Sequence, residues 1–320
     1  MEKIIIDTDA GIDDSIAILL ANAAPNVKIC AITTCFGTTT LENTTNNVLN
    51  LSSLIGLKTR IAKGAASPLI KENPIPGNFH GETGIGLAKM PETEKKAENT
   101  YAWDVLYEEA KKEKGNLTLV TLGPLTNIAT AFLKYEDLPK MLKKIVIMGG
   151  TVEEGNVSAY AEANIAHDPH ACEIVFRSKA NIVMAGLNAT EKTRLTEAER
   201  NYIFSKHTYL WRILRDMFTT YGLSQSMSGE EGLVIHDAAA MFAALYPQSA
   251  VCKKFHVVCE TASCIMQGRT IADMRLHSEE EKNVDVVLNI DKKLLLRRLI
   301  ICSTPINKYG DRRNFIWRKK

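Results

Sequence analysis

Short runs of apolar residues recur along the chain, and each is followed by a polar turn and then by a segment with helical spacing of its apolar positions. The clearest runs begin at residues 3, 27, 117, 143 and 180 and read KIIID, VKICAITT, LTLVTL, KKIVIMGG and ANIVMAG. Nearly continuous Val and Ile runs that alternate with amphipathic helices are typical of a parallel sheet buried on both faces. The pattern therefore predicts a doubly wound α/β fold, with a mostly parallel central sheet, helices on both faces and right-handed crossovers.

The first run leads into the segment IDDSIAILLANAA, which places Ile12, Ile16, Leu19 and Leu20 on one face of a predicted helix. Near the other end of the chain, IHDAAAMFAALY is predicted to be a helix as well. Three further runs, FHVVCET, TIADMR and NVDVVLNI, are predicted to be strands that close one edge of the sheet.

Two stretches interrupt the alternation of strands and helices. Residues 64–100 are rich in Gly and Pro and longer than an ordinary connection, and loops of that size are usually functional or disordered. Residues 196–235 are predicted to form a helical insertion with a Gly-rich end. Because the chain shows no internal repeat or linker, we expect a single domain over residues 1–320 that ends in a short basic tail at about 304–320.

The composition is that of an ordinary soluble globular protein, with 45% hydrophobic and 24% charged residues and a net charge of +2. That charge gives no reason to expect a nucleic acid or an acidic membrane as a partner. No apolar run approaches the ~18–20 residues needed to span a bilayer, and no signal peptide is apparent. Seven cysteines without a C-x-x-C motif fit a reducing compartment, so we expect a cytoplasmic protein.

Four carboxylates crowd the end of the first predicted strand: Asp7, Asp9, Asp13 and Asp14. In open α/β sheets, ligands bind at the carboxyl ends of the strands. Acidic residues at a helix start are common, because the helix dipole favours them, which can account for Asp13 and Asp14. It does not account for Asp7 and Asp9, since like charges at a half-buried strand end repel one another unless a cation neutralises them.

Clustered oxygen ligands with no nearby Cys or His indicate a hard cation, Ca²⁺ or Mg²⁺. An EF-hand does not fit, because a loop that starts at Asp7 would have Gly11 at its fifth position and Ile18 at its twelfth. The acidic segment is therefore predicted to bind a divalent cation in a different geometry.

The segment DTDAGIDD at 7–14 resembles the D-x-D-x-G-x-D-D signature of the inosine-uridine preferring nucleoside hydrolases, which cleave the N-glycosidic bond of ribonucleosides. Five further segments resemble this family in the same order along nearly the whole chain. They are FHGETGIG at 79–86, TLGPLTNIA at 121–129, IMGG at 147–150, GNVSAYAEANIAHDP at 155–169 and IHDAAA at 235–240. One such motif is moderately specific, whereas six in order are strongly specific. The resemblance implies a nucleoside hydrolase-like fold and an enzyme that releases free base and ribose.

By the same resemblance, a Ca²⁺ ion lies at the base of the pocket. Its implied ligands are the side chains of Asp9, Asp14 and Asp237 and the backbone carbonyl of Leu122. Such a set leaves coordination positions for a water molecule and for two ribose hydroxyls. The resemblance further implies that Asp13 binds the ribose, and we expect Asp7 to order the side chains behind the metal ligands.

The resemblance also implies a mechanism. Asp9 would be the general base for a calcium-bound water that attacks C1′ directly and inverts the anomeric carbon, and His236 would protonate the leaving base. The implied substrate-binding residues are His80 towards the nucleobase and a sugar-binding group. That group consists of Met148, Asn156, Glu162 and Asn164. Family members are commonly dimers or tetramers, so the resemblance implies a homo-oligomer that acts on small-molecule nucleosides.

The chain departs from the family pattern at some positions. Thr38 stands where many members have an Asn that meets the ribose or the attacking water, and Thr has fewer hydrogen-bonding groups than an amide. Asn188 replaces a frequent Asp, and the segment before IHD is longer than usual. In the helical insertion, Phe218 and Tyr221 share roughly one face with Arg215, and their roles are left unassigned.

Two alternatives remain open. IIIDTDAG resembles the strand-end D-x-D of haloacid-dehalogenase-like phosphatases, but we find no convincing later Lys and Asp pair, and the His-Asp and E-A-N segments would have no role. A nucleoside- or ribose-binding sensor with a weakened catalytic set is the second alternative, and Thr38 is its main support. The sequence does not define the nucleobase preference.

Overall fold

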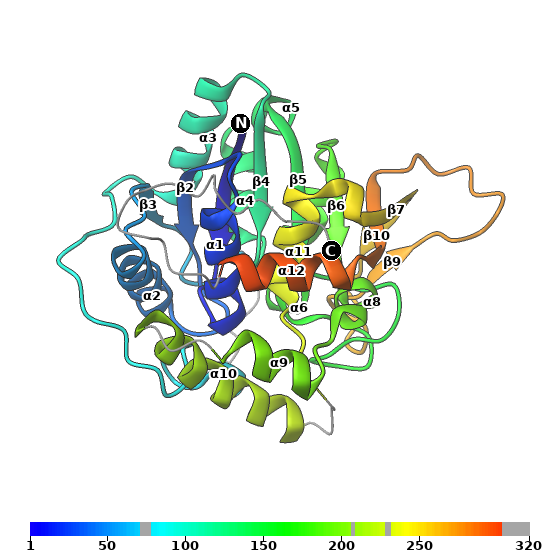
Figure 1. Cartoon of the computed structure of the whole chain (residues 1–320). Helices are drawn as coiled ribbons and strands as arrows, with labels where there is room; N and C mark the ends of the chain where they lie inside the picture. Colours follow the sequence, from blue (N-terminus) through cyan, green and yellow to red (C-terminus); the bar gives the residue numbers. More distant parts are fainter. Residues whose placement is uncertain (71–77, 206–208, 228–231, 303–320) are drawn as a thin grey trace.

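The computed structural model of the chain describes residues 1–70, 78–205, 209–227 and 232–302. Its centre is an eight-stranded sheet in the order β3-β2-β1-β4-β5-β6-β10-β7, in which the first seven strands are parallel and β7 is antiparallel to β10 (Figure 1). The strands are β1 (Glu2–Thr8), β2 (Val27–Thr34), β3 (Arg60–Lys63), β4 (Leu117–Thr121), β5 (Leu142–Met148), β6 (Ile182–Ala185), β7 (Ala250–Phe255) and β10 (Val284–Ile290).

Helices cover both faces of this sheet, as the alternation of apolar runs predicted. One apolar core lies under α1 (Ile12–Ala23), α2 (Leu41–Leu54), α10 (Tyr209–Met227), α11 (His236–Leu245) and α12 (Lys292–Cys302). The other lies under α3 (Ala102–Glu113), α4 (Thr126–Lys134), α5 (Leu138–Met141) and α7 (Pro169–Arg177). The doubly wound α/β fold is confirmed.

Strand β1 shows why a continuous Ile run belongs in such a sheet. Successive side chains of a strand point to opposite faces, so Ile4 and Ile6 enter the first core whereas Ile5 enters the second. All three are fully buried. The following helix α1 is also buried on more than the one predicted face, because α11 and α12 pack against it as well.

The predicted closing edge of the sheet is partly wrong. The run NVDVVLNI forms β10 in the main sheet, but FHVVCET and TIADMR supply β8 (Val257–Cys259) and β9 (Thr270–Ala272), which pair with each other in a separate two-stranded sheet. The edge is formed by β7, whose middle residues are exposed and include Lys253 and Lys254. Charged, exposed edge strands are common because they discourage pairing with other chains, and they lack the apolar signal used for the prediction.

The predicted helical insertion contains α9 (Glu197–Ile203) and α10, which lie together at one end of the sheet (Figure 1). The stretch 64–100 contains a single short helix, η1 (Asn78–His80), in its described part. The predicted basic tail lies outside the described residues. Among those residues we find no helix with the length and apolar character that a membrane crossing requires.

The strand order indicates where on the sheet a ligand should bind. The chain moves outwards from β1 to β2 and β3 on one side and then returns to β4, β5 and β6 on the other. Ligands of doubly wound folds bind outside the carboxyl ends of the strands at this reversal, which here lies between β1 and β4. Asp7 pairs with Thr121 in that register, so the acidic segment after β1 and Leu122 after β4 emerge side by side.

Candidate active site

The acidic segment forms a tight turn between β1 and α1. Ala10 has a φ of 38°, and Gly11 is the residue that precedes the first turn of α1. Asp14 stabilises the helix start, because its carboxylate accepts hydrogen bonds from the Gly11 backbone N–H at 2.8 Å and from the Thr8 hydroxyl. The turn thereby directs Asp9 and the first-turn residue Asp13 to the same side.

A second acidic segment joins the turn from the far end of the sequence. Asp237 lies in the first turn of α11, which packs along α1. Carboxylate oxygens of Asp13, Asp14 and Asp237 all lie within 4.8 Å of one another, and the three side chains are buried. The backbone N–H of Asp237 also donates to Asp13 at 3.5 Å. The structure therefore brings together carboxylates that are more than 200 residues apart.

Burial and mutual repulsion oppose ionisation in this group. Burial raises the pKa of Asp14 and Asp237 well above the usual range of a carboxyl group, and repulsion from the neighbouring carboxylates raises both further. Burial also raises the pKa of Asp9 to about 6, although hydrogen bonds from Thr38 lower it in part. A divalent cation among these oxygens would relieve both costs, and an all-oxygen donor set suits a hard cation.

Asp9 is held from the opposite side by the loop after β2. Its Oδ2 accepts hydrogen bonds from the backbone N–H of Thr38 at 2.6 Å and from the Thr38 hydroxyl at 2.8 Å. Gly37 makes this approach possible, since a Cβ there would lie 2.2 Å from Asp9 Oδ2. Thr38 therefore contacts the carboxylate of the predicted general base.

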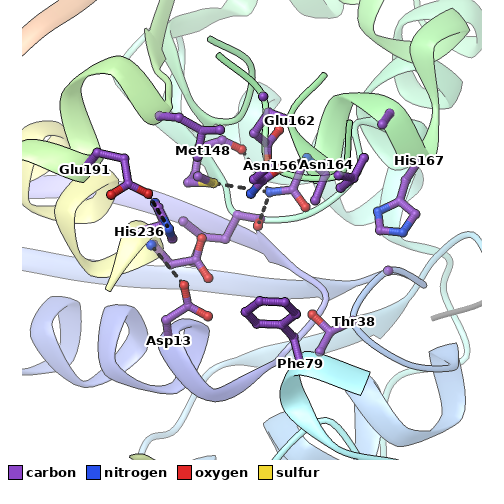
Figure 2. A pocket seen from close by; sticks show the side chains of 18 of the residues that line it. Asp13, Thr38, Phe79, Met148, Asn156, Glu162, Asn164, His167, Glu191 and His236 are labelled. Atoms are coloured by element: carbon purple, nitrogen blue, oxygen red, sulfur yellow. Dashed lines mark hydrogen bonds and ion pairs between the residues drawn. The ribbon is translucent and has the colours of Figure 1, made fainter. Parts of the chain in front are cut away.

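These groups line one cavity of about 1090 Å³ at the carboxyl end of the sheet (Figure 2). With the exception of Asp7, every residue predicted for the site contributes to its wall. These residues are Asp9, Asp13, Asp14, Thr38, His80, Leu122, Met148, Asn156, Glu162, Asn164, His236 and Asp237. The structure thus gathers in one place a set that was predicted from seven separate segments.

Asp7 lies behind the cavity rather than in its wall. It is fully buried, and its Oδ1 accepts hydrogen bonds from Asn127 at 2.8 Å and from the Thr33 hydroxyl. Burial raises the pKa of Asp7 to about 7. The bonds of Asp7 connect β1 with β2 and α4, which ties together the strands that carry the acidic segment.

His236 lies at one end of the cavity, next to Glu191 (Figure 2). Its Nδ1 is 2.8 Å from the hydroxyl of Thr190, and its Nε2 is 3.7 Å from Glu191 Oε1. Glu191 in turn forms an ion pair with Arg194. Both partners come from α8 (Leu187–Thr190) and η2 (Glu191–Thr193), which follow β6.

The chain that leads to His236 is fixed from two sides. Leu233 exchanges two backbone hydrogen bonds with Leu195, at 2.7 and 3.1 Å. The side-chain amide of Gln225 in α10 donates to the backbone carbonyl of Val234 and accepts from its backbone N–H, each at 3.0 Å. The helical insertion therefore holds the segment that presents His236 and Asp237.

The predicted sugar-binding residues converge, and each is anchored by backbone groups. Glu162 accepts hydrogen bonds from the backbone N–H groups of Gly150, Asn164 and Ile165, and burial raises its pKa to about 7. The Asn164 amide donates to the carbonyls of Leu122 at 2.8 Å and Met148 at 3.1 Å.

Asn156, on the loop between β5 and α6 (Ala163–His167), is the exposed member of the group. Its Oδ1 accepts a hydrogen bond from the backbone N–H of Ala163 at 3.0 Å. Asn156, Glu162 and Asn164 lie together on the cavity wall in Figure 2.

His80 reaches the acidic turn from η1. Its Nδ1 accepts a hydrogen bond from the backbone N–H of Ile12 at 3.1 Å, which assigns the ring proton of neutral His80 to Nε2. Burial lowers the pKa of His80. Its ring lies 5.0 Å from that of Tyr221, whose hydroxyl donates to Asp13 at 3.3 Å.

The structure adds cavity residues that the sequence reasoning missed. Tyr221 shares its helix face with Arg215 and Phe218, and that spacing alone does not distinguish a cavity position from core or surface packing. The others were assigned no role, because an isolated polar or aromatic residue in a loop or helix is usually a surface group. They are Phe79, Glu153, Glu154, His167, Glu191, Arg194 and Gln225.

Fold and cavity together define a doubly wound α/β enzyme whose ligand site, at the reversal of strand order, contains a buried carboxylate cluster suited to a divalent cation. The family model of the inosine-uridine preferring nucleoside hydrolases matches residues 4–297. The chain belongs to this family and is a nucleoside hydrolase.

Individual relatives agree with this assignment. Uridine nucleosidase 1 of Arabidopsis thaliana is 36% identical over 282 residues, which cover 86% of this chain and 83% of the relative. The pyrimidine-specific ribonucleoside hydrolase RihA of Shigella boydii is 34% identical, with 91% and 94% of the two chains covered. The solved structure of a purine-preferring ribonucleoside hydrolase from Gardnerella vaginalis superposes with a TM-score of 0.88 at 31% identity, covering 94% of this chain and 98% of that one.

After removal of the metal, the thermal stability of the protein should fall as the pH rises. The raised pKa values of Asp9 and Glu162, about 6 and 7, mean that the folded protein binds these protons more tightly than the unfolded chain does. This contribution is present below the unfolded pKa near 4 and is lost as pH rises through 6–7. We expect the Tm of chelator-treated protein to be higher at pH 5.5 than at pH 8 by at least roughly 2–4 °C, the shift that about 1 kcal/mol causes in a large domain.

A divalent cation should restore stability at pH 8, and D237N should reduce both effects because it removes one of the repelling carboxylates. Differential scanning fluorimetry of the wild type and of D237N, each with and without chelator at pH 5.5 and pH 8, measures these effects. A metal-free protein whose Tm falls as the pH is lowered from 8 to 5.5 would contradict the interpretation.

The hydroxyl of Thr38 should be needed to hold Asp9. In T38V that hydrogen bond to a carboxylate is lost, and bonds of this kind contribute about 1.5–3 kcal/mol, which predicts a fall of roughly 10- to 100-fold in kcat/KM for a nucleoside. T38S keeps the hydroxyl and should stay within about threefold of wild type. Equal activity of T38V and T38S in steady-state assays would show that the hydroxyl has no role.

Proposed function

We propose that the protein hydrolyses the N-glycosidic bond of ribonucleosides to free base and ribose, with a bound Ca²⁺ ion. The observation that carries the proposal is the buried group of Asp13, Asp14 and Asp237, with Asp9 on the wall of the same cavity. In this proposal Asp9, Asp14, Asp237 and the Leu122 carbonyl hold the cation. When bound, Ca²⁺ supplies positive charge that favours ionised carboxylates, an acidified water and chelation of the ribose diol.

Asp9 is the general base in this proposal. The two hydrogen bonds from Thr38 favour its ionised form and fix Oδ2, so the carboxylate is oriented before water arrives. Direct attack at C1′ inverts the anomeric carbon and needs no covalent intermediate. The surrounding carboxylates stabilise the positive charge that develops on the sugar.

His236 donates a proton to the departing base. Thr190 at Nδ1 and Glu191 near Nε2 hold the ring at the end of the cavity opposite His167 (Figure 2). Asp13 binds ribose hydroxyls, and the group of Met148, Asn156, Glu162 and Asn164 forms the rest of the sugar site. His80 and Tyr221 form the wall next to the base.

The charge of the cavity argues against the phosphatase alternative. Eight carboxylate residues line it, whereas Arg194 is the single Lys or Arg among its described lining residues and is paired with Glu191. A phosphate group would meet strong repulsion there. The sensor alternative rested on Thr38, but the hydrogen bonds from Thr38 to Asp9 support a catalytic role for Thr38 instead.

Uridine is the first substrate to test, because the plant and Shigella relatives described above are named for uridine or pyrimidine nucleosides. The purine-preferring structural relative makes inosine the second. The proposal extends to a cytoplasmic homo-oligomer, a dimer or tetramer, which rests on the cysteine content and the family resemblance.

Release of reducing sugar from uridine, cytidine, inosine and adenosine tests the proposal directly. We expect turnover that chelator abolishes and calcium restores, inversion at C1′ when the first-formed ribose is observed by NMR, and no measurable turnover by D9N. Nucleoside 5′-monophosphates should release no phosphate. Tight nucleoside binding without turnover over hours would instead support the sensor alternative.

The role of His236 is tested by changing the leaving group. H236A should lower kcat for uridine by roughly 10²–10⁴-fold, the usual contribution of a general acid. 4-Nitrophenyl riboside releases 4-nitrophenolate, a stable anion that needs no protonation. Its hydrolysis by H236A should therefore fall less than about tenfold. The exposed His277 provides a control, since H277A should leave both rates unchanged. Equal losses on both substrates would assign His236 a structural role.

A further inference from the structure

A buried amide connects two walls of the cavity. Asn47 lies in α2, in a helix face that is otherwise packed into the core, and only 7% of its surface is exposed. Its Nδ2 carries two hydrogens and donates both: one to the carbonyl of Ala10 at 3.1 Å and one to the carbonyl of Thr83 at 2.9 Å. Asn47 itself does not line the cavity.

The first of these carbonyls belongs to the acidic turn. Ala10 follows Asp9 directly, and its φ of 38° lies in the left-handed region, which an L-residue with a side chain adopts only when its surroundings hold it there. The hydrogen bond from Asn47 is one such restraint. It acts on the residue that reverses the chain between Asp9 and the first turn of α1.

The second carbonyl belongs to the loop that follows His80. Besides Asn47, this loop is held by the Thr39 hydroxyl, which donates to the Glu82 carbonyl at 3.0 Å, and by the bond between His80 and the Ile12 N–H. Gly84 packs closely beside the amide, since a Cβ there would lie 3.3 Å from Asn47 Nδ2. The two carbonyls are therefore bridged by one planar group with a fixed span.

We propose that Asn47 is a positioning residue for nucleoside hydrolysis, which holds the acidic turn and the His80 loop at one fixed separation. Through Ala10 it keeps the carboxylates arranged for a cation, and through Thr83 it keeps the His80 wall in place for the nucleobase. The inference rests on the proposed roles of Asp9 and His80. Its consequence is that calcium binding and nucleoside binding share a restraint that touches neither ligand.

The principal variant is N47L, which is close in shape but has no hydrogen-bond donor. Leucine fills a similar volume in the core, but it leaves the carbonyls of Ala10 and Thr83 without the donor that Asn47 supplies. We expect calcium to bind metal-free N47L at least tenfold more weakly by titration calorimetry, and KM for uridine to rise at least tenfold. Because saturating calcium and uridine re-form the site, kcat should stay within about threefold of wild type.

N46L is the matched control, since Asn46 is the adjacent residue of the same helix and is exposed. It should match wild type in all three quantities. If N47L binds calcium and uridine as wild type does, the inference is wrong. It is equally wrong if N47L loses kcat in proportion to a lowered Tm with KM unchanged, because that result describes a loss of folded protein. Should N47L not fold, N47S, whose hydroxyl is too short to bridge both carbonyls, is judged by the same criteria.

A double variant separates the two halves of the inference. Glycine adopts a φ near 38° without strain, so A10G in the N47L background should restore calcium affinity to within about threefold of wild type. It should leave KM for uridine high, because the His80 loop still lacks its hydrogen bond. No recovery of calcium affinity would refute the role at Ala10. Wild-type protein that neither binds calcium nor cleaves uridine would refute the proposed function instead.

Discussion

The structure depends on the burial of several carboxylates at the end of one strand. Asp9, Asp13, Asp14 and Asp237 are each at most 5% exposed, and Asp7 lies directly behind them. Buried like charges raise one another's pKa and destabilise the folded chain unless hydrogen bonds and a cation compensate. Much of the surrounding architecture supplies such hydrogen bonds, from Thr8 and Gly11 to Asp14, from Thr38 to Asp9, and from Thr33 and Asn127 to Asp7.

Whether a part of the structure was predictable from the sequence depends on whether its residues leave a local pattern in the chain. The apolar runs predicted the parallel sheet, because a strand buried on both faces leaves an unmistakable continuous pattern. They failed at the edge, where β7 is largely exposed and carries two lysines and where β8 and β9 pair elsewhere. Asp9, Asp13 and Asp14 stood out because they are adjacent in sequence. Asp237, His236 and Glu162 entered only through the family resemblance, since nothing in their own surroundings distinguishes them from surface or capping residues.

The parts that no pattern indicated are contacts between distant segments. Gln225 completes the backbone hydrogen bonds of Val234, and Glu191 approaches His236, but each is an unremarkable polar residue in its own helix or turn. Their partners are defined by the packing of α8 and α10 at the end of the sheet. Such partners follow from three-dimensional packing alone, so a single sequence does not reveal them.

The meeting of the two acidic segments depends on small side chains. Helix α11 begins HDAAA, and its buried residues Ala238, Ala239 and Ala240 belong to the same core as Ala17 and Ala21 of α1. Small residues let two helices approach closely, and here the first turns of both helices meet, so Asp237 reaches Asp13 and Asp14. Both helix N-termini also direct their partial positive charge at these carboxylates. Larger residues at the α1–α11 contact would therefore separate the ligands of the proposed cation site without changing a single polar group.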